Sequence, residues 1–225
     1  EGNKLEIISK FVFVACKKLN TITIPASITS IGESAFSGCE QLNTITIPAS
    51  VTSIGDGAFN ECKNLKTVTF EKDSQLESIG KDTFEYCDSL QTITIPESVK
   101  SIGESAFYEC IKLETVTFEK NSKLESIGEN AFYKCIKLKP VTFEKNSQLE
   151  SIGKDAFGDC HSLNTITLPA SVKSIGESAF AYCHSLNTIT LPASVKSIDE
   201  RAFYKCIKLE TVTFEKNSQL ETVTF

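Results

Sequence analysis

Nine cysteines are the residues of this sequence whose chemistry and spacing stand out. They lie at positions 16, 39, 62, 87, 110, 135, 160, 183 and 206, so that successive cysteines are 23 or 25 residues apart. Thiols at regular spacing could form disulfides or bind a metal. Nine is an odd number, however, and the sequence has no Cys-x-x-Cys pair, which disfavours both interpretations.

The cysteines mark an internal repeat. Each one has an Ile eight residues before it, a Phe three residues before it and a Leu three residues after it. Self-similarity at this period is typical of a solenoid, in which each unit packs only on its neighbours. We therefore predict one β-rich solenoid domain over residues 1–225, with about nine repeats of 23 or 25 residues and partial units at both ends.

Equivalent cysteines of such a solenoid stack at the strand spacing of about 4.8 Å and point the same way. A disulfide needs Cβ vectors that turn toward each other, so we expect all nine cysteines to be reduced and buried. His161 and His184 each follow a repeat cysteine, so a zinc site with Cys160 and Cys183 is conceivable. Neighbouring residues of one turn point in different directions, and we expect solvated histidines and no metal or cofactor.

Three short elements make up a unit. In the first complete example, Ile22 and Ile24 alternate with Thr, which predicts a short strand that ends at Pro25. A corner of the type Ser-Ile-Gly follows, where Gly32 permits a positive φ. One helical or 3₁₀ turn over residues 33–39 would then place an Ala, a Phe and the Cys on a single inner face.

The phenylalanines of these turns predict a second buried column. We expect it to be continuous and to contain Phe36, Phe59, Phe84, Phe107, Phe132, Phe157 and Phe180. The 25-residue units carry two additional polar residues in the segments 70–76, 118–124 and 143–149. Since the apolar positions on both sides are unchanged, we expect these segments to be bulging outer loops.

The repeated run L-x-x-I-x-I-P-x-S-V-x-S-I-G-x-x-A-F-x-x-C resembles the BspA-like class of leucine-rich repeats, known from bacterial surface proteins and mucosal protist parasites. The resemblance implies a right-handed superhelix with one parallel β-sheet on the concave face and short helical turns on the convex side. It also implies adhesion or recognition at a cell surface, and no catalytic residues. Ser9 and Asp199 depart from the family at the corner glycine, and the tail 220–225 runs directly from a loop into a strand-like motif. Incomplete end units expose an apolar cross-section, so we expect a fragment of a longer protein or ends that a partner covers.

Composition excludes several function classes. The net charge of −6 is spread without runs, which gives no footprint for nucleic acid. No apolar stretch approaches the roughly 18–20 residues of a membrane span, and the first four residues lack a signal pattern, so we expect no membrane insertion. With two histidines, neither near a convergent Asp and Ser, and no Gly-rich phosphate loop, we expect no enzyme.

The outward strand positions form two threonine columns, which only Pro140 interrupts. The residue before the first Thr varies among Asn, Lys, Gln and Glu, which suits recognition of a protein or glycan. The candidate ligand-binding residues are Lys66, Thr67, Thr69, Gln91, Thr92, Thr94, Glu114, Thr115, Thr117, Lys139, Thr142, Asn164, Thr165 and Thr167. Thr is also a good strand former, so the columns have a purely structural explanation as well. The five tyrosines cluster on the convex side and offer a second patch.

We therefore expect an extracellular or cell-surface binding module that recognises a host or matrix protein or glycan through the concave sheet. An alternative is self-assembly through uncapped ends into filaments or a surface layer, with a homo-oligomer as the product. Ice binding by the Thr-x-Thr array is a remote third possibility, because a concave sheet cannot match a flat ice face over many strands.

Overall fold

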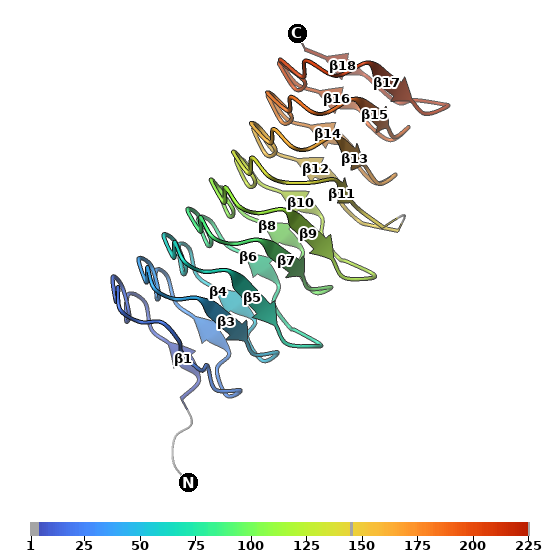
Figure 1. The fold of residues 1–225 in the computed structure, drawn as a ribbon. Helices are drawn as coiled ribbons and strands as arrows, with labels where there is room; N and C mark the ends of the chain where they lie inside the picture. Colours follow the sequence, from blue (N-terminus) through green and yellow to red (C-terminus); the bar gives the residue numbers. More distant parts are fainter. Residues whose placement is uncertain (1–4, 145, 225) are drawn as a thin grey trace.

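A computed structural model describes residues 5–144 and 146–224 of the chain. Residues 1–4, 145 and 225, which include the start and the last tail residue considered above, lie outside the described part. Figure 1 shows similar coils stacked from the N-terminus to the C-terminus, with the two termini at opposite ends of the stack. The predicted solenoid of parallel strands is confirmed.

From β3 onward the strands of two series alternate along the chain and belong to different sheets, whereas segment 21–24 forms no strand; all pairings are parallel. One series forms a ten-stranded sheet of β1 (Ile7–Ile8), β2 (Ser30–Ile31), β4 (Ser53–Ile54), β6 (Ser78–Ile79), β8 (Ser101–Ile102), β10 (Ser126–Ile127), β12 (Ser151–Ile152), β14 (Ser174–Ile175), β16 (Ser197–Ile198) and β18 (Thr222–Val223). The other series forms two four-stranded sheets, β3 (Thr44–Ile47), β5 (Thr67–Phe70), β7 (Thr92–Ile95) and β9 (Thr115–Phe118), then β11 (Val141–Thr142), β13 (Thr165–Thr167), β15 (Thr188–Leu191) and β17 (Thr211–Phe214).

The prediction of a single sheet was therefore incomplete, because the Ser-Ile corner is itself a sheet. Two residues per coil are enough to form this sheet, because the Ser-Ile pairs of neighbouring coils lie side by side in register. The ladder continues into the next residue, where the Gly55 amide donates to the Ile31 carbonyl at 2.8 Å. The same hydrogen bond recurs from coil to coil. Its donor and acceptor belong to different coils, so the sequence of one repeat does not predict it.

The core is a set of stacked columns. The predicted phenylalanine column is confirmed, with neighbouring ring centroids 5.1 Å apart for Phe107 and Phe132 and 5.5 Å apart for Phe157 and Phe180. It also continues into Phe13 and Phe203 of the end coils. Planar rings at this spacing fill the interior without gaps, which makes each coil a support for the next.

The expected helical turn is wrong, because none of the described residues forms a helix. In its place the segment from Gly32 makes three overlapping turns, in which the amides of Ala35, Ser37 and Cys39 donate to carbonyls three residues earlier. In the first and the last of these turns, Ser34 (φ 49°) and Gly38 (φ 68°) occupy the third position, as a type II turn requires. A left-handed residue every fourth position prevents helix propagation, and it leaves alternate amides free to bond the next coil, as from Phe36 to the Ala58 carbonyl at 2.8 Å.

The corner glycines also have a different role from the predicted one. Among the described glycines, positive φ is found only at Gly38 and Gly57, which are not corner residues. A Cβ at Gly128 would instead lie 2.7 Å from the carbonyl carbon of Gly103 in the preceding coil. Close approach of two backbones, rather than backbone conformation, therefore favours glycine here. Asp199 shows that the preference is not absolute, because it occupies an equivalent corner and its amide still donates to the Ile175 carbonyl at 2.9 Å. Ser9 belongs to the first coil that the structure describes.

Cysteine burial follows the same neighbour rule. The cysteines from Cys39 to Cys183 are buried, whereas Cys206 is half-buried and Cys16 is exposed. The expectation that all nine are buried was thus wrong for the two end coils, which lack a covering neighbour on one side. All nine are free thiols, in agreement with the prediction.

The segments with two additional residues bulge outward, as expected. Figure 1 shows the loops after β5, β9, β11 and β17 extending beyond the shorter loops between them. The left-handed residues Asp73, Asn121 and Asn217 turn three of these loops. Asp and Asn tolerate that conformation better than other non-glycine residues, which explains their place in the inserted sequence.

Candidate functional site

The surface carried by the strands from β3 to β17 of the second series is the Thr face. The predicted ligand-binding residues all lie on it, on strands β5, β7, β9, β11 and β13 or immediately before them, and all are exposed or half-buried. Parallel register aligns their threonines in columns, as in the pairing of Thr92 with Thr115 and of Thr94 with Thr117. The Ile or Val between two threonines points into the core, as Ile93 does at 2 % exposure. The alternation predicted from sequence therefore places the hydroxyl groups outward.

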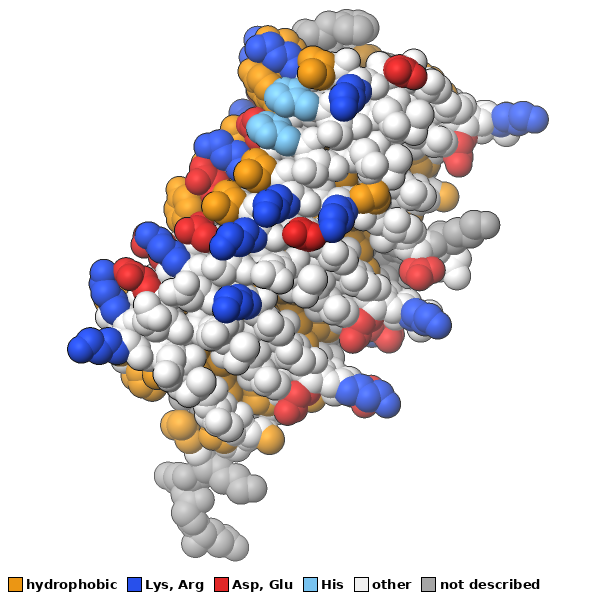
Figure 2. All heavy atoms as spheres, viewed as in Figure 1, with side chains coloured by type: hydrophobic (Ala, Val, Ile, Leu, Met, Phe, Trp, Pro, Cys, Tyr) orange, Lys and Arg blue, Asp and Glu red, His pale blue; other side chains and the backbone are white. Residues whose placement is uncertain are grey.

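Charge on the Thr face is sparse. Figure 2 shows a largely uncharged surface, with Lys, Asp and Glu gathered along the edge of the turns and at the tips of the long loops. Two of the candidate residues are bound to each other, since Lys139 Nζ lies 2.6 Å from Glu114 Oε2. This hydrogen bond and the lysine's charge lower the pKa of Glu114 below its usual value. Lys66 forms no ion pair with any residue that the structure describes, and its ammonium group is available to a ligand.

Pro140 divides the candidate site into two parts. Lys139 still donates its amide to the Glu114 carbonyl at 3.0 Å, but Pro140 has no N–H to continue the ladder, and β9 and β11 do not pair. The coils stay packed across this break, because the rings of Phe118 and Phe143 stack at 4.7 Å. The residues from Lys66 to Thr117 thus share one sheet, while Thr142 to Thr167 belong to the other.

Two hollows near the Thr face were not predicted. The first, of about 300 Å³, lies at its N-terminal end between the non-strand segment 21–24 and β3, and is lined by Thr21, Ile22, Thr23, Ile24, Thr44, Thr46, Pro48 and Glu71. Its threonines were recognised as members of the columns. The hollow exists because residues 21–24 form no strand. The sequence could not have indicated this, since these residues have the same Thr-Ile-Thr-Ile motif as strand β3.

The second hollow, of about 470 Å³, is a notch between long loops. It lies where the short loop after β7 stands between the long loops after β5 and β9, with Glu97, Asp73 and Asn121 in its wall. Glu119 Oε2 accepts a hydrogen bond from the Glu97 amide at 2.9 Å, which ties the loops together. The long, short and long order of these units was visible in the sequence and could have located the notch.

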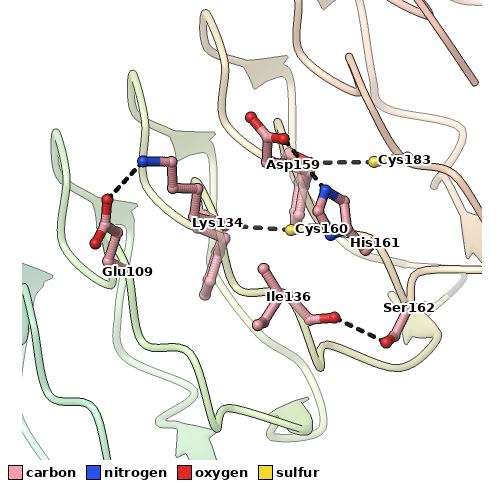
Figure 3. Close-up of polar contacts among 10 residues, drawn as sticks. Glu109, Lys134, Ile136, Asp159, Cys160, His161, Ser162 and Cys183 are labelled. Carbon is pink, nitrogen blue, oxygen red and sulfur yellow. Dashed lines mark hydrogen bonds and ion pairs between the residues drawn. The ribbon is translucent and has the colours of Figure 1, made fainter.

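The seven buried thiols, Cys39 to Cys183, are unsuited to nucleophilic or redox chemistry. Burial raises the pKa of each inner cysteine, to about 11 for Cys39. The Cys160 thiol donates a hydrogen bond to the Phe132 carbonyl at 3.2 Å, and Cys183 bonds Phe157 in the same way. Figure 3 shows these thiols beneath the outer turn, while His161 lies outside and contacts Asp159.

The two histidines form a pair away from the thiols. Their rings stack on each other at a centroid distance of 4.7 Å. The thiols of Cys160 and Cys183 instead bond carbonyl groups of the core, so the cysteines and histidines do not form a common site. Within residues 5–144 and 146–224, no group of three or more His, Cys, Asp or Glu side chains is placed to hold a metal ion. The same residues contain no helix that is long and apolar enough to cross a membrane.

Comparison with known proteins agrees with this architecture. The family model for the BspA type leucine rich repeat region matches residues 6–124 and 106–225. A search of curated proteins found no match.

Solved structures extend the comparison. A leucine-rich repeat protein from Bacteroides ovatus is 30% identical with a TM-score of 0.53, over 98% of this chain and 66% of that one. The T. pallidum leucine rich repeat protein is 29% identical with a TM-score of 0.62, over 81% of this chain and 72% of its own. The pneumococcal vaccine antigen PcpA, at 23% identity and a TM-score of 0.57 over 95% and 67%, shares the fold. This chain thus spans about two thirds of the length of these proteins.

Proposed function

Since the chain belongs to the BspA-type leucine-rich repeat family, we propose that it is a non-catalytic binding module that recognises a protein or glycan through the Thr face. One observation carries the proposal. The Thr face presents exposed hydroxyl groups in fixed columns beside a position that changes from coil to coil, as in Lys66, Gln91 and Glu114. Because most inward positions repeat from coil to coil, this varying position on the Thr face gives neighbouring coils a different surface chemistry.

The chemistry of the surface favours a polar ligand. Hydroxyl, amide and a few charged groups supply many hydrogen bonds, and large aromatic anchors are absent from the residues described on this face. Binding is therefore spread over several strands rather than concentrated in a hot spot. An extracellular or cell-surface location, with a host or matrix protein or glycan as partner, is part of this proposal and is supported by the family resemblance.

The test is a charge and size change on the Thr face with a matched change elsewhere. Thr92→Arg and Thr117→Arg together would project two long cations from neighbouring strands, and we expect at least about a tenfold loss of binding to an immobilised glycan array or matrix-protein panel. Thr29→Arg and Thr52→Arg together are the control, because both threonines are exposed just before β2 and β4 of the other sheet. Equal loss for both proteins, with unchanged circular dichroism, would contradict the Thr face as the docking surface.

A second candidate function has its own observation. The exposed large hydrophobic side chains all belong to the terminal coils, namely Leu5, Ile7, Phe11, Val12 and Val14 at one end and Tyr204, Ile207, Val212, Phe214 and Val223 at the other. Apolar ends with open strand edges favour association of copies end to end.

Light scattering over a range of concentrations distinguishes the two candidates. End-to-end association predicts particles that grow with concentration, and it predicts that Ile207→Lys with Phe214→Lys abolishes this growth. A monomer at every concentration would exclude self-assembly and leave recognition through the Thr face.

A further inference from the structure

The outer turns carry two tyrosine pairs that are equivalent in sequence and in geometry. In each pair the first Tyr directly precedes a repeat cysteine and the second directly follows a core phenylalanine of the next coil. The ring centroids of Tyr86 and Tyr108 are 5.6 Å apart at 80°, and those of Tyr182 and Tyr204 are 5.5 Å apart at 87°. The repeat has therefore built the same aromatic site twice.

One of these sites is filled by the chain itself. The ammonium group of Lys205 lies over both rings of the second pair, 5.1 Å from the centroid of Tyr182 and 5.3 Å from that of Tyr204. These distances are within the range of cation–π attraction, in which the negative face of an aromatic ring holds a cation. The tyrosine pair of this fold is thus a cation site.

The other site has a glutamate in place of that lysine. Glu109 occupies the place of Lys205, with a φ of 53° against 54°. Beside Tyr86 is an open hollow of about 410 Å³, lined by Glu61, Lys63, Tyr86, Asp88, Glu109 and Ile111. The lining thus contains three carboxylates, one ammonium group, an aromatic ring and an isoleucine side chain, so that acidic groups outnumber basic ones in it.

The nearest lysine of the following coil serves a different contact. Lys134 Nζ lies 2.7 Å from Glu109 Oε1 and 5.5 Å from the ring centroid of Tyr133. Figure 3 shows Lys134 extended toward Glu109 across two coils. Among the residues that the structure describes, no lysine has its ammonium group over Tyr86 or Tyr108.

The ionised form of one carboxylate in the hollow is destabilised by its surroundings. Burial is the largest cause that raises the pKa of Asp88; the charge of Lys63 acts in the opposite direction, and the nearby charge of Glu109 raises it further. An incoming positive charge would relieve the repulsion among these groups.

We propose that the hollow beside Tyr86 docks a lysine side chain of a partner protein, with its ammonium group placed as Lys205 is placed over the Tyr182–Tyr204 pair. Ile111 would contact the aliphatic part of that side chain, and Glu61, Asp88 and Glu109 would surround its charge. This site lies on the turns, away from the Thr face, and does not depend on the function proposed for that face.

The test uses a short lysine peptide and its uncharged analogue. The probe is acetyl-Ala-Lys-Ala-amide, and norleucine replaces lysine in the control peptide. Binding is followed by amide chemical shifts and by tyrosine emission, which is unobscured because the chain has five Tyr and no Trp. We expect the shifts to centre on Tyr86 and Glu109, and the lysine peptide to bind about tenfold more tightly than the norleucine peptide.

Three variants make the test specific. Glu109→Lys should fill the hollow with the chain's own cation and remove binding, and it should fold because Lys134 and Lys205 occupy the same left-handed position. Glu129→Lys is the charge-matched control, since Glu129 is exposed and does not line the hollow, and it should bind as the original chain does. Lys205→Glu should create a second site at Tyr182.

The outcomes that overturn the proposal are equally definite. Equal affinity for both peptides would show that the ammonium group is not recognised. Equal weakening by Glu109→Lys and Glu129→Lys would show attraction by net charge alone. Should Glu109→Lys fail to fold, Tyr86→Asn removes the ring with a residue that tolerates positive φ, and undiminished binding in that variant would also exclude the site.

Discussion

The thiol of Cys110 donates a hydrogen bond to the carbonyl oxygen of Phe84 in the preceding coil, with Sγ and O 3.1 Å apart. The same carbonyl accepts the amide of Cys87 at 3.2 Å. Equivalent thiol bonds occur at every repeat cysteine from Cys39 to Cys206. Each cysteine therefore fills core space and joins two coils, which explains why a small polarisable donor occupies this column.

Thiol labelling should separate the cysteines into three classes. In the native protein we expect Cys16 to react rapidly, Cys206 slowly, and the seven buried cysteines only after denaturation, because reagents cannot reach them. Mass spectrometry after a timed reaction with iodoacetamide measures this. Rapid native labelling of Cys110 would contradict its burial.

Stability should fall at alkaline pH. Burial raises the pKa of the inner thiols, so they stay neutral in the folded state while those of the unfolded chain ionise above their ordinary value near 8.5. The stabilisation is complete below that pH and is lost as the pH rises, by about 1.4 kcal/mol per pH unit for each such thiol. Urea unfolding at pH 7 to 10 under reducing conditions measures the slope, and Cys110→Ala should reduce it. An unchanged slope in this variant would exclude thiol ionisation as the cause.

Truncation of the phenylalanine column should be costly. Phe107 is fully buried between Phe84 and Phe132, at 5.4 and 5.1 Å, so Phe107→Ala should lower the free energy of unfolding by about 3–5 kcal/mol. Tyr108→Ala is the neighbouring control and should cost much less, because Tyr108 is only half-buried. Equal losses in urea denaturation would mean that the inward face is assigned wrongly.

Close backbone approach predicts that corner glycines reject a side chain. Gly128→Ala would place a Cβ 2.8 Å from the Glu104 amide nitrogen, and forcing the coils apart should cost about 1–3 kcal/mol. Gly38→Asn is the control, since the nearest atom to a Cβ there is Ala15 Cα at 3.5 Å and Asn tolerates the φ of 68°. Thermal or urea unfolding compares the two, and a loss at Gly128 no larger than that at Gly38 would show that close backbone approach does not explain the corner glycine.

Replacement of Pro140 should join the two sheets of the Thr face. Pro140→Thr restores an N–H opposite the Glu114 carbonyl, and we expect slowed hydrogen exchange at residue 140 and at its neighbour Val141. The hydrogen bond contributes about 1 kcal/mol, which the greater freedom of the unfolded chain offsets by about 0.4–1 kcal/mol. Exchange protection is therefore a better measure than global stability. Fast exchange at residue 140 would show that the break does not depend on the missing donor.

The sequence by itself determined the solenoid, the phenylalanine column and the outward threonines. Each of these depends on the period of the repeat and on the alternation of side chains along a strand, so that one unit specifies all others. Thr92 and Thr94 could be placed outward and Ile93 inward from their order alone. The interruption by Pro140 was equally legible, because a residue without an N–H weakens any ladder.

Only the tertiary structure decided what one coil does to the next. The Ser-Ile corner becomes a ten-stranded sheet, and the turn after Gly32 bonds the following coil through alternate amides, because stacking supplies partners that no single unit contains. The exposure of Cys16, the need for Gly128 and the difference between the tyrosine sites at Glu109 and Lys205 have the same origin. These features depend on which residue of a neighbouring coil lies next to the side chain in question. The spacing of the repeats does not give the distance or the direction between two such residues.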